Sequence, residues 1–138
     1  MTFPLISRRE SAARVRVRYA ETDKMGVVYY SNYLVWFEVG RCEWLRSTGY
    51  SYNRLEADGT ILPVIEAHCE YRRPLRYDDE VEIKARATLL SPARVRFDYD
   101  VRPVGAQEPF AVGWTEHCGI DPGGRPRRLP PTLRRLFE

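Results

Sequence analysis

Cysteine and histidine are scarce in this chain, which has three cysteines and two histidines among 138 residues. Cys42, Cys69 and Cys118 are widely spaced and include no CxxC pair, which argues against a disulfide framework and against a zinc knuckle. His68-Cys69 and His117-Cys118 are adjacent pairs, but neighbouring strand residues point to opposite faces. Each pair therefore offers only one ligand to a common site, whereas structural zinc needs four, and we expect no metal site.

Long apolar runs are also missing. No stretch approaches the ~18 apolar residues that cross a bilayer, and the opening MTFPLISRRE lacks the basic segment and cleavage pattern of a secretory signal. We therefore expect no membrane span and a cytoplasmic location. Apolar residues make up 43% and charged residues 30%, the balance of a globular protein, and 138 residues suit one compact domain over residues 1–138.

Positive charge is unevenly placed, although the net charge is only +3. Arginines cluster at positions 14, 16 and 18 and again at 125, 127, 128, 134 and 135, which fits either an anionic partner or a solvated strand face and tail. No recognition helix or aromatic RNA-binding stripe accompanies them, so nucleic acid is not expected as a partner. Whether the end of the chain, residues 130–138, folds into a docking helix is left open.

The first half of the chain predicts one strand and one helix. Residues 14–19 alternate strictly between apolar and basic, as in a half-buried strand. Ser31 and Asn32 favour helix N-caps, and a helix is predicted from about residue 32 to residue 48, ended by Gly49. Because its apolar residues occur on almost every side, we expect this helix to be enclosed by other elements.

Four alternating segments follow, over residues 65–72, 80–89, 94–101 and 110–120. The apolar face of the last segment is expected to carry Phe110, Val112, Trp114, Cys118 and Ile120. Short connections favour antiparallel neighbours, and a sheet that curls around the helix buries both most economically, which is an α+β arrangement. The core is expected over about residues 14–121, followed by a basic tail over residues 122–138.

The most informative stretch, residues 19–33, joins the end of the first strand to the start of the helix. Free backbone N–H groups and the positive end of the helix dipole coincide there, which suits an anion or a developing oxyanion. Asp23 places a carboxylate beside this point, and Gly26 fits a tight turn. The alternative is that Asp23 only forms a turn, that Asn32 is a plain N-cap, and that Tyr29 and Tyr30 pack in the core.

This stretch resembles the active-site segment of the 4-hydroxybenzoyl-CoA thioesterase family of hotdog proteins. The family pattern is an aromatic residue, an acidic residue, Thr-Asp, two variable residues, Gly, Val and then an Asn-Tyr pair. The residues that fill it here are Tyr19, Glu21, Thr22, Asp23, Gly26, Val27, Asn32 and Tyr33. The helix and the strand order are similar as well, over roughly residues 14–121. The resemblance implies a hotdog fold, a five-stranded antiparallel sheet wrapped around one long central helix.

The resemblance also implies hydrolysis of an acyl-CoA thioester to a free acid and CoA. Asp23 takes the place of the catalytic carboxylate, and either attacks the thioester carbonyl or activates a water molecule as a general base. The backbone N–H of Tyr30 matches the oxyanion donor of the family. Gly26 matches the glycine of the family pattern, in a tight turn between Asp23 and Tyr30. The CoA thioester is the substrate, so no cofactor is implied. Two alternatives stay open: an acyl-carrier-protein thioesterase, and a non-catalytic protein that binds acyl groups or CoA.

Substrate contacts are expected from Tyr29, Asn32, Glu38 and Arg41. Glu38 and Arg41 are three residues apart, so they either pair with each other or leave Arg41 facing the acyl group. The second interpretation follows a sister group of hotdog proteins that releases polyketide chains with a helix arginine, although that group has Asn where this chain has Asp23. The candidate ligands for the CoA phosphates, chosen because guanidinium groups suit phosphate oxygens, are Arg72, Arg73, Arg94 and Arg96.

A single hotdog domain leaves a sheet edge and much apolar surface unprotected. In the family that this chain resembles, active sites lie between two subunits, and many members pair further into tetramers. The resemblance therefore implies at least a homodimer and favours a homotetramer.

Overall fold

The structure of the protein, a computed structural model, describes residues 2–138, so Met1 of the predicted domain lies outside the described residues. The principal elements in chain order are β1 (Leu5–Arg16), α1 (Asn32–Ser47), α2 (Tyr52–Ala57), β2 (Val64–Tyr71), β3 (Glu80–Ser91), β4 (Arg94–Pro103), β5 (Ala111–Cys118) and α3 (Pro131–Arg134). Two 3-10 turns, η1 (Tyr19–Glu21) and η2 (Arg135–Phe137), follow β1 and α3. None of the helices in residues 2–138 is long and apolar enough to cross a membrane.

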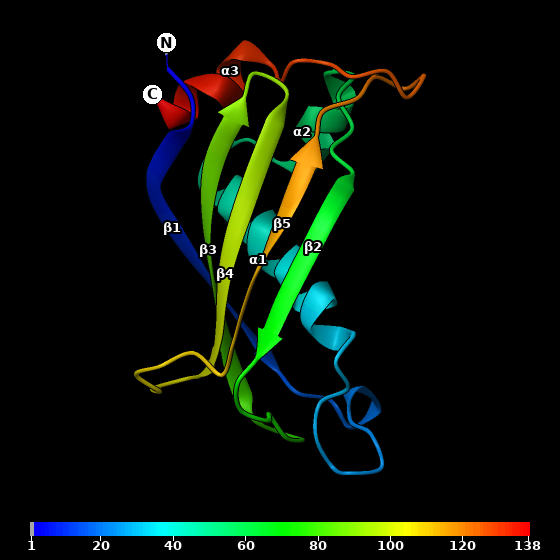
Figure 1. Cartoon of the computed structure of the whole chain (residues 1–138), viewed down its shortest axis with the longest axis vertical. Coiled ribbons are helices and arrows are strands. Elements are labelled where there is room, and N and C mark those ends of the chain that lie inside the picture. The colour runs from blue at the N-terminus through cyan, green and yellow to red at the C-terminus, as the bar shows by residue number, and fades with distance from the viewer. Residues whose placement is uncertain (1) are drawn as a thin grey trace.

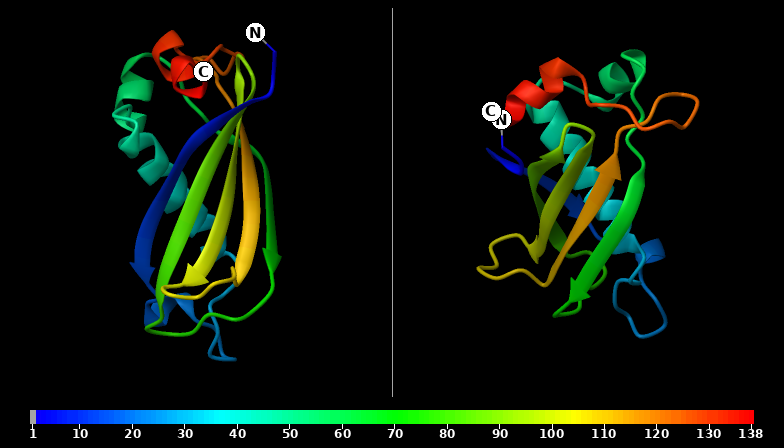
Figure 2. Two further views of the ribbon diagram at one scale, coloured as in Figure 1. Left: turned by 90° about the vertical axis from the view of Figure 1, so that its left-hand side faces the viewer. Right: turned by 45° about the horizontal axis from the view of Figure 1, so that its top comes forward.

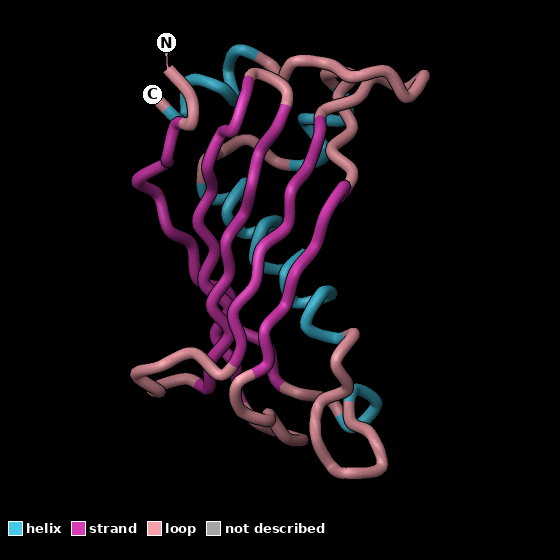
Figure 3. Tube along the Cα trace, in the orientation of Figure 1, coloured by secondary structure: helices cyan, strands magenta, loops and turns pink. Residues whose placement is uncertain are grey.

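The five strands form one antiparallel sheet in the order β1-β3-β4-β5-β2 (Figure 3). Helix α1 lies along one face of this sheet and contacts β1, β2, β3 and β4 (Figures 1 and 2). The α+β arrangement predicted from the sequence, a five-stranded antiparallel sheet around one long helix, is confirmed. Both chain termini lie at one end of the molecule, and the segment that links β1 to α1 lies at the other end (Figure 1).

The bounds of α1 agree with the prediction, and Gly49 has the positive φ, +83°, of a residue that ends a helix. The buried residues recur at the spacing of one helix face and are Tyr33, Trp36, Phe37, Gly40, Trp44 and Leu45. The prediction that α1 is enclosed on every side is wrong for a single chain. Leu34 and Val35 are 43% and 55% exposed, because the sheet covers only one side of the helix.

The first strand is longer than predicted and lies earlier in the chain. β1 begins at Leu5 and ends at Arg16, whereas the predicted strand covered residues 14–19. Tyr19 is 78% exposed in the turn η1, so it does not continue the buried strand face. The strand ends here because the Glu21 side chain accepts the backbone N–H of Arg18 at 2.8 Å, which closes the chain into a turn.

The inward face of β5 is the opposite of the predicted one. Ala111 and Gly113 are buried, together with the polar Thr115 and His117, while Trp114 on the outer face packs under the Arg96 guanidinium at 4.5 Å. The alternation was predicted correctly, but the apolar residues were assigned to the wrong side. Small residues face inward because α1 passes close by, and a Cβ at Gly113 would lie 2.6 Å from the Phe37 ring.

The basic C-terminal stretch contributes to the core, beyond the range 14–121 that was expected to hold it. Leu129, Leu133 and Phe137 are all at most 5% exposed, and the Phe137 ring packs 5.6 Å from that of Trp44 in α1. The short helix α3 and the turn η2 present these apolar residues, so the arginines of this stretch point away from the core. Residues 130–138 therefore dock on their own chain.

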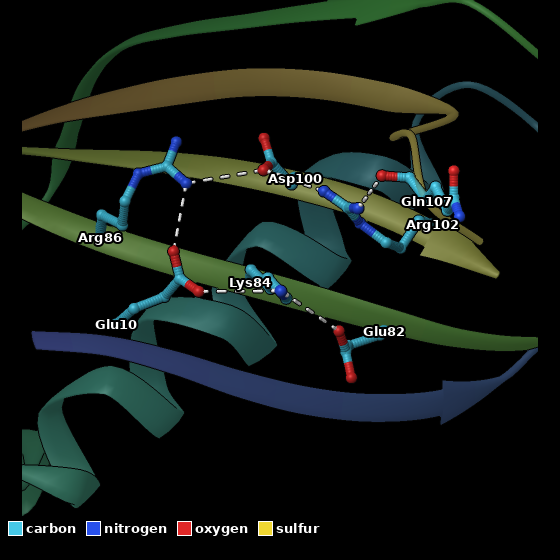
Figure 4. A network of polar contacts seen from close by, with 7 residues as sticks. All are labelled: Glu10, Glu82, Lys84, Arg86, Asp100, Arg102 and Gln107. Carbon is cyan, nitrogen blue, oxygen red and sulfur yellow. Dashed lines mark hydrogen bonds and ion pairs between the residues drawn. The ribbon is translucent and has the colours of Figure 1, made fainter. Parts of the chain in front are cut away.

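The outer face of the sheet is polar and crossed by ion pairs. Glu10 of β1 lies 3.8 Å from Lys84 and 3.4 Å from Arg86 of β3, and Arg86 lies 3.5 Å from Asp100 of β4 (Figure 4). These groups are partly exposed, so each pair adds at most about 1 kcal/mol. The alternating charges of the strands are thus largely matched to one another across the sheet.

Candidate functional site

Asp23 lies in a tight turn at the end of the molecule where β1 gives way to α1. Its carboxylate oxygen Oδ1 accepts the backbone N–H groups of Met25 at 2.9 Å and Val27 at 3.3 Å. Gly26 has φ +80°, which explains why glycine is needed there, and its N–H donates to the Asp23 carbonyl at 3.0 Å. The turn therefore holds the carboxylate by one oxygen and leaves Oδ2 without a hydrogen-bond partner within residues 2–138.

Asn32 and Glu21 fix this turn against the start of α1. The Asn32 amide donates to the carbonyl of Glu21 at 3.0 Å and to that of Tyr29 at 3.3 Å, so Asn32 is a donor that ties two segments together. The interpretation of Asn32 as a plain N-cap is wrong, since a cap side chain accepts hydrogen bonds. The Glu21 carboxylate, 6% exposed, accepts the indole N–H of Trp36 at 3.1 Å. Sequence reasoning found Glu21 only as part of a motif.

Two backbone N–H groups are free at the amino end of α1. The N–H groups of residues 32–34 donate to the carbonyls of residues 29–31 at 3.0 to 3.3 Å. Those of Tyr30 and Ser31 have no acceptor within the part of the chain that the structure describes. Free amides at this position, together with the helix dipole, stabilise negative charge. The Tyr30 N–H is therefore available to a ligand oxygen.

A cavity of about 550 Å³ brings Asp23 and Tyr30 together. Its wall is mostly apolar and is formed by Asp23, Met25, Val27, Val28, Tyr29, Tyr30, Tyr33, Tyr71, Arg72, Arg73 and Pro74. A second depression is lined by Asp23, Tyr29 and Asn32 among others. Asp23 thus borders two clefts, and an acid–base or nucleophilic role requires such access to a ligand.

Sequence reasoning found Tyr33 only as part of a motif and did not place Tyr71 in this cavity, although both line it. Tyr71 at the end of β2 packs edge-on against Tyr33 of α1, with ring centroids 4.9 Å apart, and donates its hydroxyl to the Tyr30 carbonyl at 3.0 Å. Burial raises the pKa of Tyr33 to about 12, so this wall carries no phenolate charge at neutral pH. The alternation of β2 contained Tyr71, but only the fold shows that its ring reaches the helix.

The four candidate CoA ligands fall into two groups. Arg72 and Arg73 follow β2 and line the cavity that holds Asp23. Arg96 lies on the outer sheet face, where it pairs with Asp98 at 3.1 Å and covers Trp114, and Arg94 is exposed at the start of β4. In a single chain, therefore, only Arg72 and Arg73 accompany Asp23.

Glu38 and Arg41 lie farther along α1 and do not line the cavity that holds Asp23. They border a separate cavity of about 340 Å³ between α1 and β2, which we call the α1–β2 cavity. Their side chains are 4.0 Å apart, at the limit of an ion pair, and Glu38 is 65% exposed whereas Arg41 is only 12% exposed. The predicted ion pair between Glu38 and Arg41 is therefore weak. Of the two side chains, the charged guanidinium is the buried one.

A buried polar chain lies behind this cavity. The Tyr99 hydroxyl is 2.6 Å from Thr115 Oγ1, which is 2.8 Å from His117 Nε2, and His117 Nδ1 is 3.1 Å from the Leu62 carbonyl oxygen. The pKa of His117 is lowered to about 4, mainly by burial and in smaller part by the charge of Arg41, while the Leu62 hydrogen bond acts in the opposite direction. His117 is therefore a neutral imidazole at physiological pH.

This histidine should make folding stability depend on pH. Its folded pKa of about 4 lies below the ordinary value of 6.5, so the unfolded chain binds more protons between these values. Stability is then complete above pH 6.5 and is lost as the pH falls toward 4, by about 2 kcal/mol between pH 7 and pH 5. Urea unfolding at both pH values measures this loss.

The second histidine supplies the control, because His68 is exposed on β2. We expect the His117→Gln variant to lose most of the pH dependence and the His68→Gln variant to keep it. An unchanged dependence in His117→Gln would show that other groups cause it.

Within residues 2–138, no group of three or more His, Cys, Asp or Glu side chains is arranged to hold a metal ion. Cys42, Cys69 and Cys118 are all free thiols. Neither observation places a metal-binding side chain group in the cavity that holds Asp23.

Comparison with known proteins gives one family match over most of the chain. The family model described as the Thioesterase-like superfamily matches residues 17–137. Acyl-CoA thioester hydrolase YbgC from Escherichia coli is 39% identical over 76 residues, which are 55% of this chain and 57% of that protein. The acyl-acyl carrier protein thioesterase ATL3 of Arabidopsis thaliana is 32% identical over 123 residues, which are 89% of this chain and 65% of ATL3. Less than two thirds of each of these two relatives is thus matched, whereas a putative esterase from Aquifex aeolicus is 38% identical over 112 residues, which are 80% of this chain and 84% of that protein.

Among solved structures, the DHNA-CoA thioesterase from Staphylococcus aureus is similar to this chain along almost its whole length. The TM-score is 0.87 at 32% sequence identity, and the match covers 93% of this chain and 88% of the other. The two chains therefore share the arrangement of the sheet and the long helix.

Proposed function

Because the chain belongs to the thioesterase-like superfamily, we propose that it hydrolyses acyl-CoA thioesters to a free acid and CoA, with Asp23 as the catalytic carboxylate. Its hotdog fold, predicted from the sequence, is confirmed by the similarity to solved thioesterases. The observation that carries the assignment to Asp23 is that Asp23 and Tyr30, whose N–H is free, line one cavity at the amino end of α1. A carboxylate and an oxyanion donor at one site are what thioester hydrolysis needs.

The geometry suits two forms of the reaction. In the first, Asp23 Oδ2 attacks the thioester carbonyl carbon, CoA leaves as the thiolate, and water then cleaves the resulting anhydride. In the second, Oδ2 takes a proton from a water molecule as that water attacks the same carbon. In both, the carbonyl oxygen gains negative charge and accepts the Tyr30 N–H, so one site serves either route.

The rest of the cavity suits the remainder of the substrate. Tyr29 and Tyr33 supply an apolar wall near the reacting carbonyl, while Asn32 holds the turn rather than reaching into the cavity. Arg72 and Arg73, which line the same cavity, are our candidates for binding the CoA phosphates. One guanidinium group can donate two parallel hydrogen bonds to two phosphate oxygens. Arg94 and Arg96 have no such position in one chain. The reaction as proposed uses no cofactor.

The direct test is thiol release from a panel of short-chain, long-chain and aromatic acyl-CoA substrates. We expect turnover of at least one of them. An acyl-carrier-protein thioester of the same acyl group belongs in the panel, since the match to ATL3 favours a carrier-protein substrate as the second candidate. Faster hydrolysis of the carrier-protein thioester would favour the acyl-carrier-protein thioesterase. If no thioester in the panel is hydrolysed, the remaining alternative is a non-catalytic protein that binds acyl groups or CoA.

We also propose that two copies of the chain pair through β2 and the open side of α1. β2 is an edge strand, and the apolar residues exposed around it are Leu34, Val35, Val64, Ile65 and Tyr71. An unpaired strand edge beside an exposed apolar surface is suited to pairing with a second copy. Such a homodimer would cover the α1–β2 cavity and border the cavity that holds Asp23. A homotetramer and a cytoplasmic location stay predictions.

This pairing predicts the behaviour of one charged substitution. Val35→Lys, at a site that is 55% exposed on α1, should convert the dimer to a monomer, because a lysine would be buried without a partner. Light scattering after gel filtration measures the mass. Ile6→Lys, at a site that is 72% exposed on the opposite edge strand, is the matched control and should leave the mass unchanged. A monomeric native protein would contradict the proposal.

A further inference from the structure

The α1–β2 cavity has apolar walls and one nearly buried cation. Leu34, Val35, Val64 and Ala67 form the walls, and Arg41 reaches the cavity from α1. Arg41 comes nine residues after the start of α1, so it lies roughly 14 Å along the helix from the catalytic turn. The two cavities share no lining residue, so an acyl group that reaches Arg41 would have to run along α1 from the reacting carbonyl.

The charge of Arg41 is not matched by the protein. Within residues 2–138, Glu38 is the only carboxylate within 4.0 Å of the guanidinium, and its own side chain is 65% exposed. The neutral hydroxyls of Tyr52 and Tyr99 also interact with the guanidinium. A guanidinium stays charged at every physiological pH, and enclosing a charge without a close partner costs free energy. An anion in the cavity would remove this cost.

The polar chain behind Arg41 has a fixed direction. The Leu62 carbonyl only accepts, so Nδ1 of the neutral His117 carries the proton and Nε2 accepts from Thr115. Thr115 in turn accepts from the Tyr99 hydroxyl, whose proton is thereby used. Tyr99 then has only lone pairs left for Arg41. The chain therefore orients the guanidinium but supplies no negative charge.

Tyr52 is a second polar group beside Arg41. Its hydroxyl is buried and has no hydrogen-bond partner within 3.5 Å among the described residues, and it interacts with the Arg41 guanidinium as a neutral phenol. Tyr52 does not line the α1–β2 cavity, so the donors that a ligand there would use are those of Arg41.

We propose that the α1–β2 cavity binds the far end of an acyl group that terminates in a carboxylate, with Arg41 as the binding residue and Tyr99, Thr115 and His117 as positioning residues. The preferred substrates are then thioesters of dicarboxylic acids. This inference rests on the thioesterase activity proposed above, because it assigns the acyl end of the same substrate. A carboxylate fits better than a neutral hydroxyl, since it matches the charge of Arg41 and offers two acceptor oxygens.

The test compares two thioesters of equal chain length, adipoyl-CoA and hexanoyl-CoA, with suberoyl-CoA and octanoyl-CoA as a longer pair. We expect kcat/KM to favour the carboxylate-terminated member by about 10-fold or more in at least one pair, as a charge-assisted hydrogen bond provides. In Arg41→Met, a side chain of similar length without charge, this ratio should fall to one or below. A native ratio of one or below in both pairs, or the same ratio in Arg41→Met, overturns the proposal.

A binding measurement separates this proposal from the proposed function. Calorimetry with adipate and with the neutral hexane-1,6-diol of the same chain length tests the cavity whether or not the protein hydrolyses thioesters. Adipate binding that Arg41→Met abolishes supports the site even if no acyl-CoA is turned over, in which case only the catalytic proposal fails. Equal or absent binding of the two compounds overturns the site even if the enzyme is active. A cavity filled by a second copy of the chain gives this last result.

The positioning role has its own matched pair of variants. Thr115→Val removes the hydroxyl that links Tyr99 to His117, and Thr115→Ser keeps it. We expect Thr115→Val to raise KM for the carboxylate-terminated thioester about tenfold, more than it lowers kcat, and Thr115→Ser to retain most of the native preference. A purely structural role would change both members of the substrate pair equally in both variants.

Discussion

Replacing Asp23 with asparagine is expected to lower kcat/KM for acyl-CoA hydrolysis by about 10³-fold, within the range that a general base contributes. Asparagine has nearly the same shape and still accepts the Met25 N–H through its amide oxygen, so the turn should persist. What it loses is the free oxygen Oδ2, which either attacks the carbonyl or takes the proton of water. Thiol release at saturating and limiting substrate measures the loss.

The control for this substitution is Glu108→Gln, which makes the same carboxylate-to-amide change at an exposed loop residue. It should retain full activity. Asp23→Asn should unfold at the same temperature as the native protein and still bind CoA, since Arg72 and Arg73 are unchanged. Native activity in Asp23→Asn would remove Asp23 from the mechanism and leave the family assignment in place.

The largest stability effect is expected from Gly113→Ala. Gly113 faces α1 from the centre of β5, and a Cβ there would lie 2.3 Å from the His68 carbonyl oxygen of β2 and 2.6 Å from the Phe37 ring. One contact is backbone in the neighbouring strand, so a side-chain rotation cannot relieve it. We expect the free energy of unfolding to fall by about 3 kcal/mol, at the upper end of overpacking effects. Urea unfolding measures it.

Gly123→Ala provides the comparison in the loop after β5. A Cβ at Gly123 would meet only the Asp121 carboxylate, at 3.3 Å, and the residue does not have a positive φ. The change should alter the free energy of unfolding by no more than about 0.5 kcal/mol. If both glycine variants proved equally stable, β5 would not pack against α1 as closely as the structure has it.

Where local sequence signals were strong, they were sufficient to predict the secondary structure. The helix from Asn32 to the glycine that follows it, the four later strands and their antiparallel orientation were predicted from periodicity and turn residues, whereas the strand order was not. The turn at Asp23 and Gly26 was likewise predicted, because a positive φ is required there and few residues adopt it. These features depend on residues that are close together in the chain.

The errors in the face of β5 and in the phosphate ligands share one physical origin. Alternation shows that a strand has two faces, but it does not say which one meets the helix, and in β5 the closeness of α1 placed Gly113 inside and Trp114 outside. The same limit applies to the candidate site. Arg73 and Arg96 were equivalent as phosphate ligands in the sequence, and the fold put one at the cavity and the other on the opposite sheet face.

By itself the sequence determined the long helix, the four later strands, the fold class and the turn at Asp23, because short-range hydrogen bonds and side-chain periodicity set them. Only the tertiary structure decided which residues surround that turn, how Tyr71 meets Tyr33, and that His117 stands neutral behind Arg41. Tyr33 and Tyr71, and likewise Arg41 and His117, are 38 or more positions apart in the chain. Burial, rather than residue type, sets the protonation state of His117. They arise only when the sheet closes on the helix.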